Sequence, residues 1–383
     1  MRKRAKKIDK FNDIVMNSPK YAPQSLQDLA KLSECEKSII NLSRNENPFD
    51  IPENIKEIFF EKVRQVSLNR YPELTSENIR QKIADFFNSY FDLTNVGLTR
   101  DLTKENIAVG NGSDELISYL IRIFPGNEVI ICTPTFEMYE FYSSLNGLKI
   151  KNCPLNQEFE IEDIHKEITE KTGLVFICSP NNPTGNLQPE EEILKILETG
   201  VPVVLDEAYA DFSKTSMIKY ISQYPNLVIL RTFSKAFGLA GIRAGVLIAN
   251  QEIVSQLMRI ESPYSFNILT EKMLETMLEN YNTVLDNIEY IIEERTFLSS
   301  QLKGYALKSN ANFILLDLGS LTDMKGITSN MAYKYFLQNG IIVRRYDNVP
   351  RVENKIRITV GTREENRRFL ACFRKMKDDV TAI

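Results

Sequence analysis

Histidine, paired cysteines and long apolar runs are scarce or missing in this chain of 383 residues. The only histidine, His165, leaves almost no room for a histidine-based catalytic triad or a multi-histidine metal site, so we expect no metal. Five cysteines are scattered without a Cys-x-x-Cys pair, which predicts reduced thiols and a cytoplasmic protein. No apolar run approaches the ~20 residues that span a bilayer, so we expect no membrane partner.

An excess of charge of either sign is also lacking, because the formal net charge is -4 with 26% charged residues. This balance gives no overall attraction to nucleic acid, which is therefore not an expected partner. Basic residues gather only at the amino terminus, at Arg2, Lys3, Arg4, Lys6, Lys7 and Lys10. Because no apolar segment of signal-peptide length follows them, we interpret this stretch as a disordered arm rather than a targeting signal.

Short apolar runs alternate with helical patterns between about residues 105 and 250. Runs that are apolar on both faces are typical of strands in a mostly parallel sheet covered by helices. The pattern predicts an α/β domain with strands at Glu128–Thr133, Leu174–Ser179, Val203–Asp206, Leu227–Arg231 and Gly245–Ala249.

A second, smaller domain is predicted from a change in the order of elements after Ser262-Pro263. A long helical pattern at Leu269–Leu302 precedes expected strands at Asn312–Leu318, Ile341–Arg345 and Ile356–Val360 around a helix at Met331–Leu337. This order is typical of an α+β unit. The predicted organisation is an N-terminal arm (1–45) that contributes to the small domain and the site, a large domain (46–265) and a small C-terminal domain (266–383).

Polar clusters follow several predicted strands, where open parallel sheets collect their binding residues. In the first, Gly110-Asn111-Gly112-Ser113-Asp114-Glu115 precedes a helical run at Leu116–Phe124. Two glycines allow a tight turn, and Ser113 or Asp114 is expected to cap the helix, whose free amides then face an anion. Phosphate groups are bound in this way at the start of a helix. An ordinary capped helix that binds no ligand can have the same residue types at its start.

Three further positions carry polar or aromatic groups after strands. Asp206 ends a strand, and a buried carboxylate there needs a cationic partner unless it is an ordinary cap residue. The loop Ser179-Pro180-Asn181-Asn182-Pro183-Thr184-Gly185 is stiffened by two prolines and would hold the amide of Asn182 near Asp206. Phe136 can stack on a planar ring, although an aromatic residue after a strand is more often part of the core.

The most informative cluster surrounds Lys235, in Arg231-Thr232-Phe233-Ser234-Lys235 and on to Arg243. A lysine at the end of a buried strand is partly desolvated, which lowers its pKa and makes its amine a nucleophile able to form a Schiff base. Thr232, Ser234 and Arg243 supply hydroxyl groups and a guanidinium suited to phosphate oxygens. A solvated surface lysine is the alternative for Lys235 taken alone.

In their order along the chain, these clusters resemble the class I/II, fold-type I enzymes that use pyridoxal phosphate, an α/β fold with a large and a smaller domain. The resemblance implies three catalytic residues: Lys235 holds the cofactor as an internal aldimine and later carries a proton at the substrate Cα, Asp206 pairs with the ring nitrogen, and Tyr209 binds the ring hydroxyl. It implies further cofactor contacts from Gly112, Ser113, Asp114, Phe136, Asn182, Thr232, Ser234 and Arg243.

A closer resemblance is to the histidinol-phosphate aminotransferases, carried by Asn45–Pro48, Asn69–Glu73, Gly110–Glu115, Pro134–Tyr139, Asp206–Tyr209 and Ile356–Thr362. It implies that Tyr71 reaches the cofactor phosphate of a neighbouring subunit, and therefore a homodimer with shared active sites. It implies substrate contacts from Arg357, Arg344, Tyr21 and Asn182. The chain departs from this family at Gln24, where many relatives have glycine, and at Arg345, which doubles Arg344.

The activity that this resemblance implies is transamination from histidinol phosphate to 2-oxoglutarate, a step of histidine biosynthesis. Its partners would be a small-molecule amino donor and a 2-oxo acid acceptor. An aminotransferase for another amino acid, aromatic or biosynthetic, and a threonine-phosphate decarboxylase have similar sites and stay open as alternatives. A non-catalytic binding module is disfavoured, because Lys235, Asp206 and Arg357 are all present.

Overall fold

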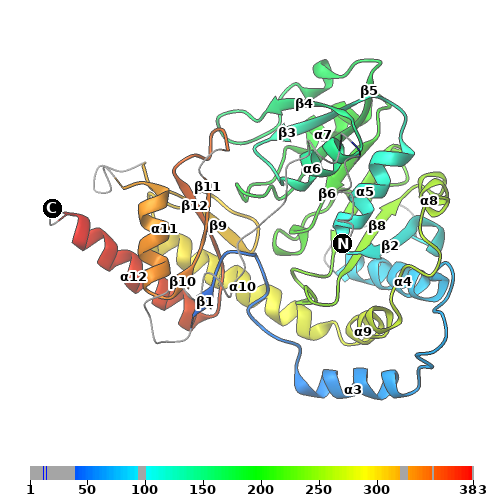
Figure 1. Cartoon of the computed structure of the whole chain (residues 1–383), viewed down its shortest axis with the longest axis horizontal. Helices are drawn as coiled ribbons and strands as arrows, with labels where there is room; N and C mark the ends of the chain where they lie inside the picture. The colour runs from blue at the N-terminus through cyan, green and yellow to red at the C-terminus, as the bar shows by residue number, and fades with distance from the viewer. Residues whose placement is uncertain are drawn as a thin grey trace, which may run out of the picture.

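The structure of the protein is a computed structural model that describes residues 39–93, 101–319, 327–346 and 349–381, together with Asn12 and Ile14. A large sheet with helices on both faces forms one part of the molecule, and a smaller sheet with its own helices lies beside it (Figure 1). The large sheet contains β2 (Ile107–Asn111), β3 (Glu128–Thr133), β4 (Lys149–Pro154), β5 (Thr172–Cys178), β6 (Val203–Asp206), β7 (Leu227–Thr232) and β8 (Ala244–Ala249).

The strand order of this seven-stranded sheet is β2-β8-β7-β6-β5-β3-β4. Strand β8 is antiparallel to β2 and β7, while β7, β6, β5, β3 and β4 pair in parallel. Cys178 lies opposite Asp206, and Asp206 lies opposite Leu230, so the carboxyl ends of β5, β6 and β7 meet at one edge. This is the edge at which open parallel sheets bind ligands.

Alternate residues of each central strand enter two separate cores, as the two-residue period of a strand requires. In β7, Leu227 and Ile229 join one core, whereas Val228 and Leu230 join the other. The first face is covered by α4 (Glu77–Leu93) and α7 (Glu190–Leu197), the second by α5 (Ser113–Ile123), α6 (Met138–Leu145) and α8 (Gln251–Met258). Burial on both faces explains why these strands read as continuous apolar runs.

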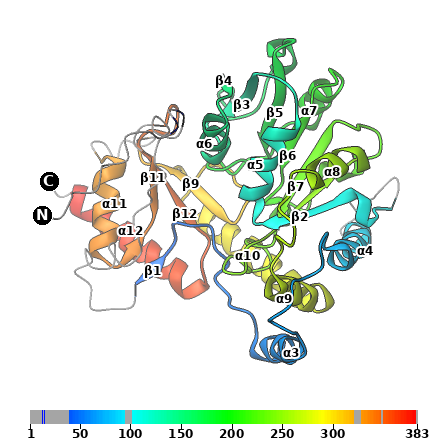
Figure 2. The same cartoon turned by 45° about the vertical axis from the view of Figure 1, so that its right-hand side comes forward.

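The smaller part has a three-stranded antiparallel sheet in the order β11 (Arg344–Tyr346), β12 (Lys355–Thr359), β9 (Phe313–Asp317). The short strand β1 (Ile40–Asn41) pairs in parallel with β10 (Ile341–Ile342). Helices α10 (Asn282–Gln301), α11 (Ser329–Gln338) and α12 (Arg363–Thr381) surround these strands (Figure 2). Chain that follows β1 therefore runs from the smaller part to the larger one.

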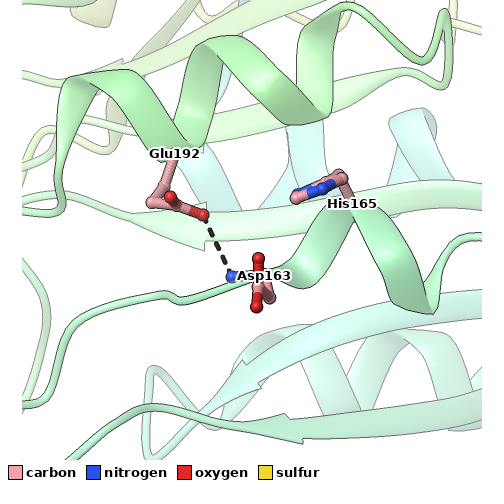
Figure 3. A group of neighbouring side chains, drawn as sticks. All are labelled: Asp163, His165 and Glu192. Atoms are coloured by element: carbon pink, nitrogen blue, oxygen red, sulfur yellow. Dashed lines mark hydrogen bonds between the residues drawn. The ribbon is translucent and has the colours of Figure 1, made fainter.

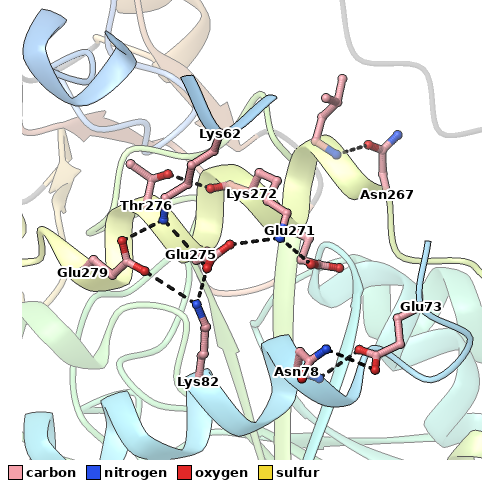
Figure 4. Close-up of polar contacts among 11 residues, drawn as sticks. Lys62, Glu73, Asn78, Lys82, Asn267, Glu271, Lys272, Glu275, Thr276 and Glu279 are labelled. Carbon is pink, nitrogen blue, oxygen red and sulfur yellow. Dashed lines mark hydrogen bonds and ion pairs between the residues drawn. The ribbon is translucent and has the colours of Figure 1, made fainter. Parts of the chain in front are cut away.

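Helix α9 (Ile268–Glu279) packs against α3 (Glu53–Arg64) and α4, and a network of charges joins the three helices (Figure 4). Lys62 Nζ lies 2.7 Å from Glu279 Oε2 and 3.8 Å from Glu275 Oε1. Lys82 pairs with the same two carboxylates, and Lys272 Nζ lies 3.1 Å from Glu275 Oε2. Glu275 is thus shared by three lysines from three helices.

Every strand predicted for the α/β domain is present within a few residues, but two other predictions are wrong. The pattern at Leu269–Leu302 predicts one helix, whereas α9 ends at Glu279 and α10 begins at Asn282. The side chain of Asn280 donates to the Thr276 carbonyl at 2.8 Å, and such local bonding by asparagine ends a helix. The strand expected at Ile341–Arg345 divides into β10 and β11, which pair with different strands.

Short 3-10 helices complete the described chain at Lys104–Asn106, Ile164–Glu167, Ala210–Phe212 and Met217–Tyr220. Among the helices of the described ranges, none has both the length and the apolar character needed to cross a bilayer. The domain limits at residues 45 and 265 stay predictions, and α9, which begins just after the second limit, contacts helices of the larger part.

Candidate active site

A cavity of about 270 Å³ opens where β5, β6 and β7 end. All the predicted cofactor contacts except Gly112 and Tyr71 line this cavity. The lining residues are Arg44, Glu46, Ser113, Asp114, Phe136, Cys178, Asn182, Asp206, Ala208, Tyr209, Thr232, Ser234, Lys235, Ala240 and Arg243. Strand order therefore gathers side chains from Ser113 to Arg243, which lie 130 positions apart in the sequence, while Arg44 and Glu46 come from the segment before the large sheet.

Lys235 lies in the loop after β7, with its amine at the cavity. Its Nζ donates to the Arg44 carbonyl at 3.1 Å. Desolvation lowers the pKa of Lys235 to about 8, and the positive charge of Arg357 adds to this effect. Near neutral pH a useful fraction of the amine is therefore uncharged and nucleophilic.

Asp206, at the end of β6, is a buried carboxylate that is held by neutral donors. Tyr139 donates its hydroxyl to Oδ2 at 2.6 Å, and the Ala208 backbone N–H donates to Oδ1 at 3.0 Å. Burial raises the pKa of Asp206 to about 6. Among the described residues, no cation forms a hydrogen bond or ion pair with this carboxylate, so a cationic group placed in the cavity would complete its surroundings.

The start of α5 lies where the anion cradle is predicted, but its N-cap is not the predicted one. Gly112 is the N-cap residue, and no side chain caps the helix. The expected cap at Ser113 or Asp114 is wrong because both residues already lie in the first helical turn, too late to accept from it. Gly112 has φ 82°, and a Cβ there would clash with the guanidinium of Arg243. Only glycine suits this position.

Arg243 and the hydroxyl residues complete the cradle on the other side. Arg243 Nη2 lies 3.5 Å from Asp114 Oδ2, and burial raises the pKa of Asp114. Thr232 and Ser234 are buried beside it, and Thr232 Oγ1 accepts the Ser234 backbone N–H at 3.1 Å. Hydroxyls, a guanidinium and the start of a helix are together suited to a phosphate group.

Tyr209 and Asn182 connect the cavity to the smaller part of the molecule. The Tyr209 hydroxyl accepts from Asn45 Nδ2 at 3.0 Å, and burial raises the pKa of Tyr209. Asn182 Oδ1 accepts from Arg357 Nη1, which leaves the Asn182 amide free to donate toward the cavity. Arg357, on β12, also donates from Nη2 to the Ser43 carbonyl at 2.7 Å. Its Nε is buried and has no partner among the described residues, so one donor is left for a bound anion.

Of the predicted contacts that the structure describes, four lie outside the cavity lining: Gly112, Arg357, Arg344 and Tyr71. Arg344 is opposite Arg357 in the β11–β12 pair, and its Nη2 lies 3.2 Å from Glu137 Oε1 on the larger part. Tyr71 is 80% exposed and stacks on Tyr264 with a centroid separation of 4.7 Å. Tyr21, Gln24 and the basic residues 1–10 lie outside the described residues.

The sequence assigns no site role to several residues that the structure brings to the cavity or to Asp206. Tyr139 donates to Asp206 and stacks on Phe176, and its place three positions after Phe136 is the available signal in the sequence. Cys178 lies opposite Asp206 in the strand pair and lines the cavity. Arg44 and Glu46 had no signal, because they reach the cavity through a tertiary contact of the N-terminal segment.

A second group of polar side chains lies on the 3-10 helix Ile164–Glu167 and on α7 (Figure 3). The ligand atoms of Asp163, His165 and Glu192 lie within 4.8 Å of one another. Both carboxylates are already paired, Asp163 with Lys166 at 2.7 Å and Glu192 with Lys195 at 2.6 Å. Glu192 also accepts the Asp163 backbone N–H at 3.0 Å. We therefore assign no metal to this group.

The chain is similar to known proteins over most of its length. Residues 37–373 match the family model described as aminotransferase class I and II. Histidinol-phosphate aminotransferase of Thermococcus gammatolerans is 47% identical over 86% of this chain and 90% of its own, and that of Pyrococcus furiosus is 43% identical over 88% and 92%.

Solved structures share the fold. The histidinol-phosphate aminotransferase of Sinorhizobium meliloti, crystallised with pyridoxal-5'-phosphate, matches with a TM-score of 0.82 at 19% identity, over 98% of this chain and 99% of its own. This likeness confirms the α/β fold, with its mostly parallel central sheet, that the strand pattern predicts. Together with the family match over most of the sequence, it shows that the chain belongs to the class I and II aminotransferases.

Proposed function

We propose that this aminotransferase transfers the amino group of histidinol phosphate to 2-oxoglutarate, with pyridoxal phosphate as its cofactor, in histidine biosynthesis. The observation that carries the chemistry is that one cavity is lined both by Lys235, whose pKa is lowered, and by the buried carboxylate of Asp206. The choice of substrate is supported by the curated relatives at 47% and 43% identity, whose names state it.

The residues present fit this cofactor. Asp206 is a buried carboxylate that no cation among the described residues contacts by a hydrogen bond or ion pair, and a protonated pyridine nitrogen would supply such a contact. The cradle of Gly112, Arg243 and the neighbouring hydroxyls suits a phosphate group, and a side chain larger than glycine would close it. Phe136 would stack on the ring, while Asn182 and Tyr209 would bind its hydroxyl.

When bound, pyridoxal phosphate supplies an electron sink for the negative charge that develops at the substrate Cα. The protein supplies the proton transfers. The Lys235 amine, which is uncharged above its pKa of about 8, would accept the proton from the substrate Cα and then donate it to the C4′ atom of the cofactor. Asp206 would keep the pyridine nitrogen of the cofactor protonated. The Tyr139 hydroxyl donates to the Asp206 carboxylate and holds it in place.

The substrate would lie between the two parts of the molecule, where Arg357 of the smaller sheet contacts Asn182 of the cavity lining. Arg357 keeps one free buried donor, Nε, for the carboxylate of glutamate or 2-oxoglutarate. Asn182 fixes the guanidinium of Arg357 in this orientation. Arg344 and Tyr21 would bind the phosphate end of histidinol phosphate, and Arg344 would exchange its present partner Glu137 for that phosphate.

An aminotransferase for another amino acid and a threonine-phosphate decarboxylase are the competing functions. The test is to incubate the protein and pyridoxal phosphate with 2-oxoglutarate and one of four donors: histidinol phosphate, L-phenylalanine, L-tyrosine or threonine phosphate. We expect glutamate to form from histidinol phosphate at least about tenfold faster than from any other donor. Release of carbon dioxide from threonine phosphate, or a clear preference for another donor, would overturn the proposal.

We also propose a homodimer with shared sites and a cytoplasmic location. Tyr71 is 80% exposed and does not line the cavity of its own subunit, as a residue that reaches a neighbouring site requires. The four described cysteines are free and buried, which is in keeping with a reducing compartment.

A further inference from the structure

One short segment, residues 43–46, lies between the two parts of the molecule, and three of its consecutive carbonyl groups are held by side chains. The Ser43 carbonyl accepts from Arg357, the Arg44 carbonyl from Lys235 at 3.1 Å, and the Asn45 carbonyl from Asn312 Nδ2 at 3.0 Å. We call this segment the strap. Its backbone is fixed by residues from both parts of the molecule, so the side chains that it carries have defined positions.

Asn45 determines which side chains of the strap face the cavity. It has φ 54°, in the left-handed region that asparagine tolerates better than most residues. Its backbone N–H donates to Thr359 Oγ1 at 2.9 Å, and its amide donates to Tyr209. With Asn45 1% exposed and turned into the protein, the flanking side chains of Arg44 and Glu46 both line the cavity.

Arg44 differs from the other arginines near the site because its guanidinium is not engaged. Arg243 pairs with Asp114, Arg344 pairs with Glu137, and Arg357 is bound to Asn182. Within the described ranges, the side chain of Arg44 forms no hydrogen bond or ion pair, and it is exposed at the cavity. An unpaired guanidinium on a fixed backbone at the cavity is a receptor for an anion.

We propose that Arg44 makes a further contact to the phosphate group of the amino donor, in addition to the contact proposed for Arg344, and contributes to the preference for a phosphorylated substrate. This inference rests on the proposed function, in which histidinol phosphate is that donor. A planar guanidinium can bind two phosphate oxygens at once. Arg243 in the cradle would bind the phosphate of the cofactor, so Arg44 is available to bind the phosphate of the amino donor.

The test is a double-mutant-type cycle, in which the phosphate is removed from the substrate and the positive charge of Arg44 is removed from the protein, separately and together. Values of kcat/KM are measured for histidinol phosphate and for histidinol, with the parent protein and with Arg44→Gln, Arg44→Lys and Arg259→Gln. In Arg44→Gln we expect the ratio of the two values to fall about 10- to 100-fold, the effect of losing a hydrogen bond to a charged group. Arg44→Lys keeps a cation and should retain part of the preference. Arg259→Gln removes an exposed arginine that does not line the cavity and should leave the ratio unchanged.

The two substrates make the result independent of folding losses, because an inactive fraction of the sample lowers both values equally and cancels in the ratio. An unchanged ratio in Arg44→Gln, or an equal loss for both substrates, would overturn the role of Arg44. A parent protein that does not use histidinol phosphate would instead overturn the proposed function, and this inference would fall with it. The two failures are therefore distinguishable from the parent data alone.

Discussion

At the residue scale, the site combines two ionisable groups whose pKa values are brought closer together by burial. Desolvation lowers the pKa of Lys235 to about 8 and raises that of Asp206 to about 6. Both groups were predicted from the sequence, because a lysine and an aspartate directly after buried strands have few structural uses. Arg44 could not be predicted in this way, since its place at the cavity depends on a left-handed Asn45 and on contacts to Lys235 and Thr359.

Replacing Asp206 should separate stability from function. The pKa of its carboxyl is about 3.8 in an unfolded chain and about 6 in the folded one, so the folded state binds more protons between these values. The unfavourable effect of burial is therefore fully present above about pH 6 and disappears below about pH 4. At pH 7, Asp206→Asn should raise the free energy of unfolding of the cofactor-free protein by up to about 3 kcal/mol, whereas catalysis should fall at least about 100-fold.

Urea unfolding at pH 7 and pH 5 measures this effect, and the gain should be smaller at pH 5. Tyr139→Phe is the matched control, because it removes a donor to the carboxylate and should lower stability at pH 7. A loss of stability in Asp206→Asn at pH 7 would mean that the burial of this carboxylate is compensated within the protein itself.

At the element scale, strands that are apolar on both faces were the reliable part of the prediction. Their period and length leave little alternative, and all five predicted strands of the large sheet are present. The break between α9 and α10 was missed because apolar spacing continues across it, and the local sign of the break is the single residue Asn280, which caps α9 and bonds the Thr276 carbonyl. The division of β10 from β11 depends on partners in β1 and β12, which a local pattern does not contain.

The charge network between α3, α4 and α9 should contribute to the docking of these helices (Figure 4). Glu275 has a side chain only 15% exposed and pairs with Lys62, Lys82 and Lys272. Glu275→Gln should lower the free energy of unfolding by about 1 kcal/mol at low ionic strength, with less effect in about 1 M NaCl because salt screens the pairs.

The control for this network is Glu289→Gln, which removes an ion pair with Lys214 in which both side chains are about half exposed. Its effect on unfolding should be close to zero. Equal effects of the two substitutions, or an effect of Glu275→Gln that salt leaves unchanged, would show that charge pairing does not hold α9 against α3 and α4.

At the scale of the whole molecule, the cavity is lined by residues at the edge of the large sheet together with Arg44 and Glu46 of the strap, and Tyr71 is not among the lining residues. The family resemblance predicts that Tyr71 reaches a neighbouring subunit, whereas composition and periodicity contain no information on this contact. Tyr71 stacks on Tyr264, and Leu68, Leu74, Ile260 and Leu269, which lie within a few positions of these two tyrosines in the sequence, are also exposed. We propose these exposed side chains as the contact between subunits.

Mixing two inactive variants tests the shared site directly. In a mixed dimer of Tyr71→Ala and Lys235→Ala, one site carries both substitutions and the other carries neither. Unfolding and refolding the two proteins together at equal amounts should therefore recover up to about a quarter of the parent activity. A mixture no more active than its components would contradict a site that takes Tyr71 from the neighbouring subunit, and a parent that sediments as a monomer would contradict the dimer.

The central claim is that the amine of Lys235 forms the covalent bond to pyridoxal phosphate. The most direct measurement is to load the protein with the cofactor, reduce the bond with borohydride, digest the product and locate the added mass by tandem mass spectrometry. The account predicts one modified peptide, with the phosphopyridoxyl group on Lys235, and none in Lys235→Ala. A label on another lysine, or equal labelling of the Lys235→Ala variant, would contradict it.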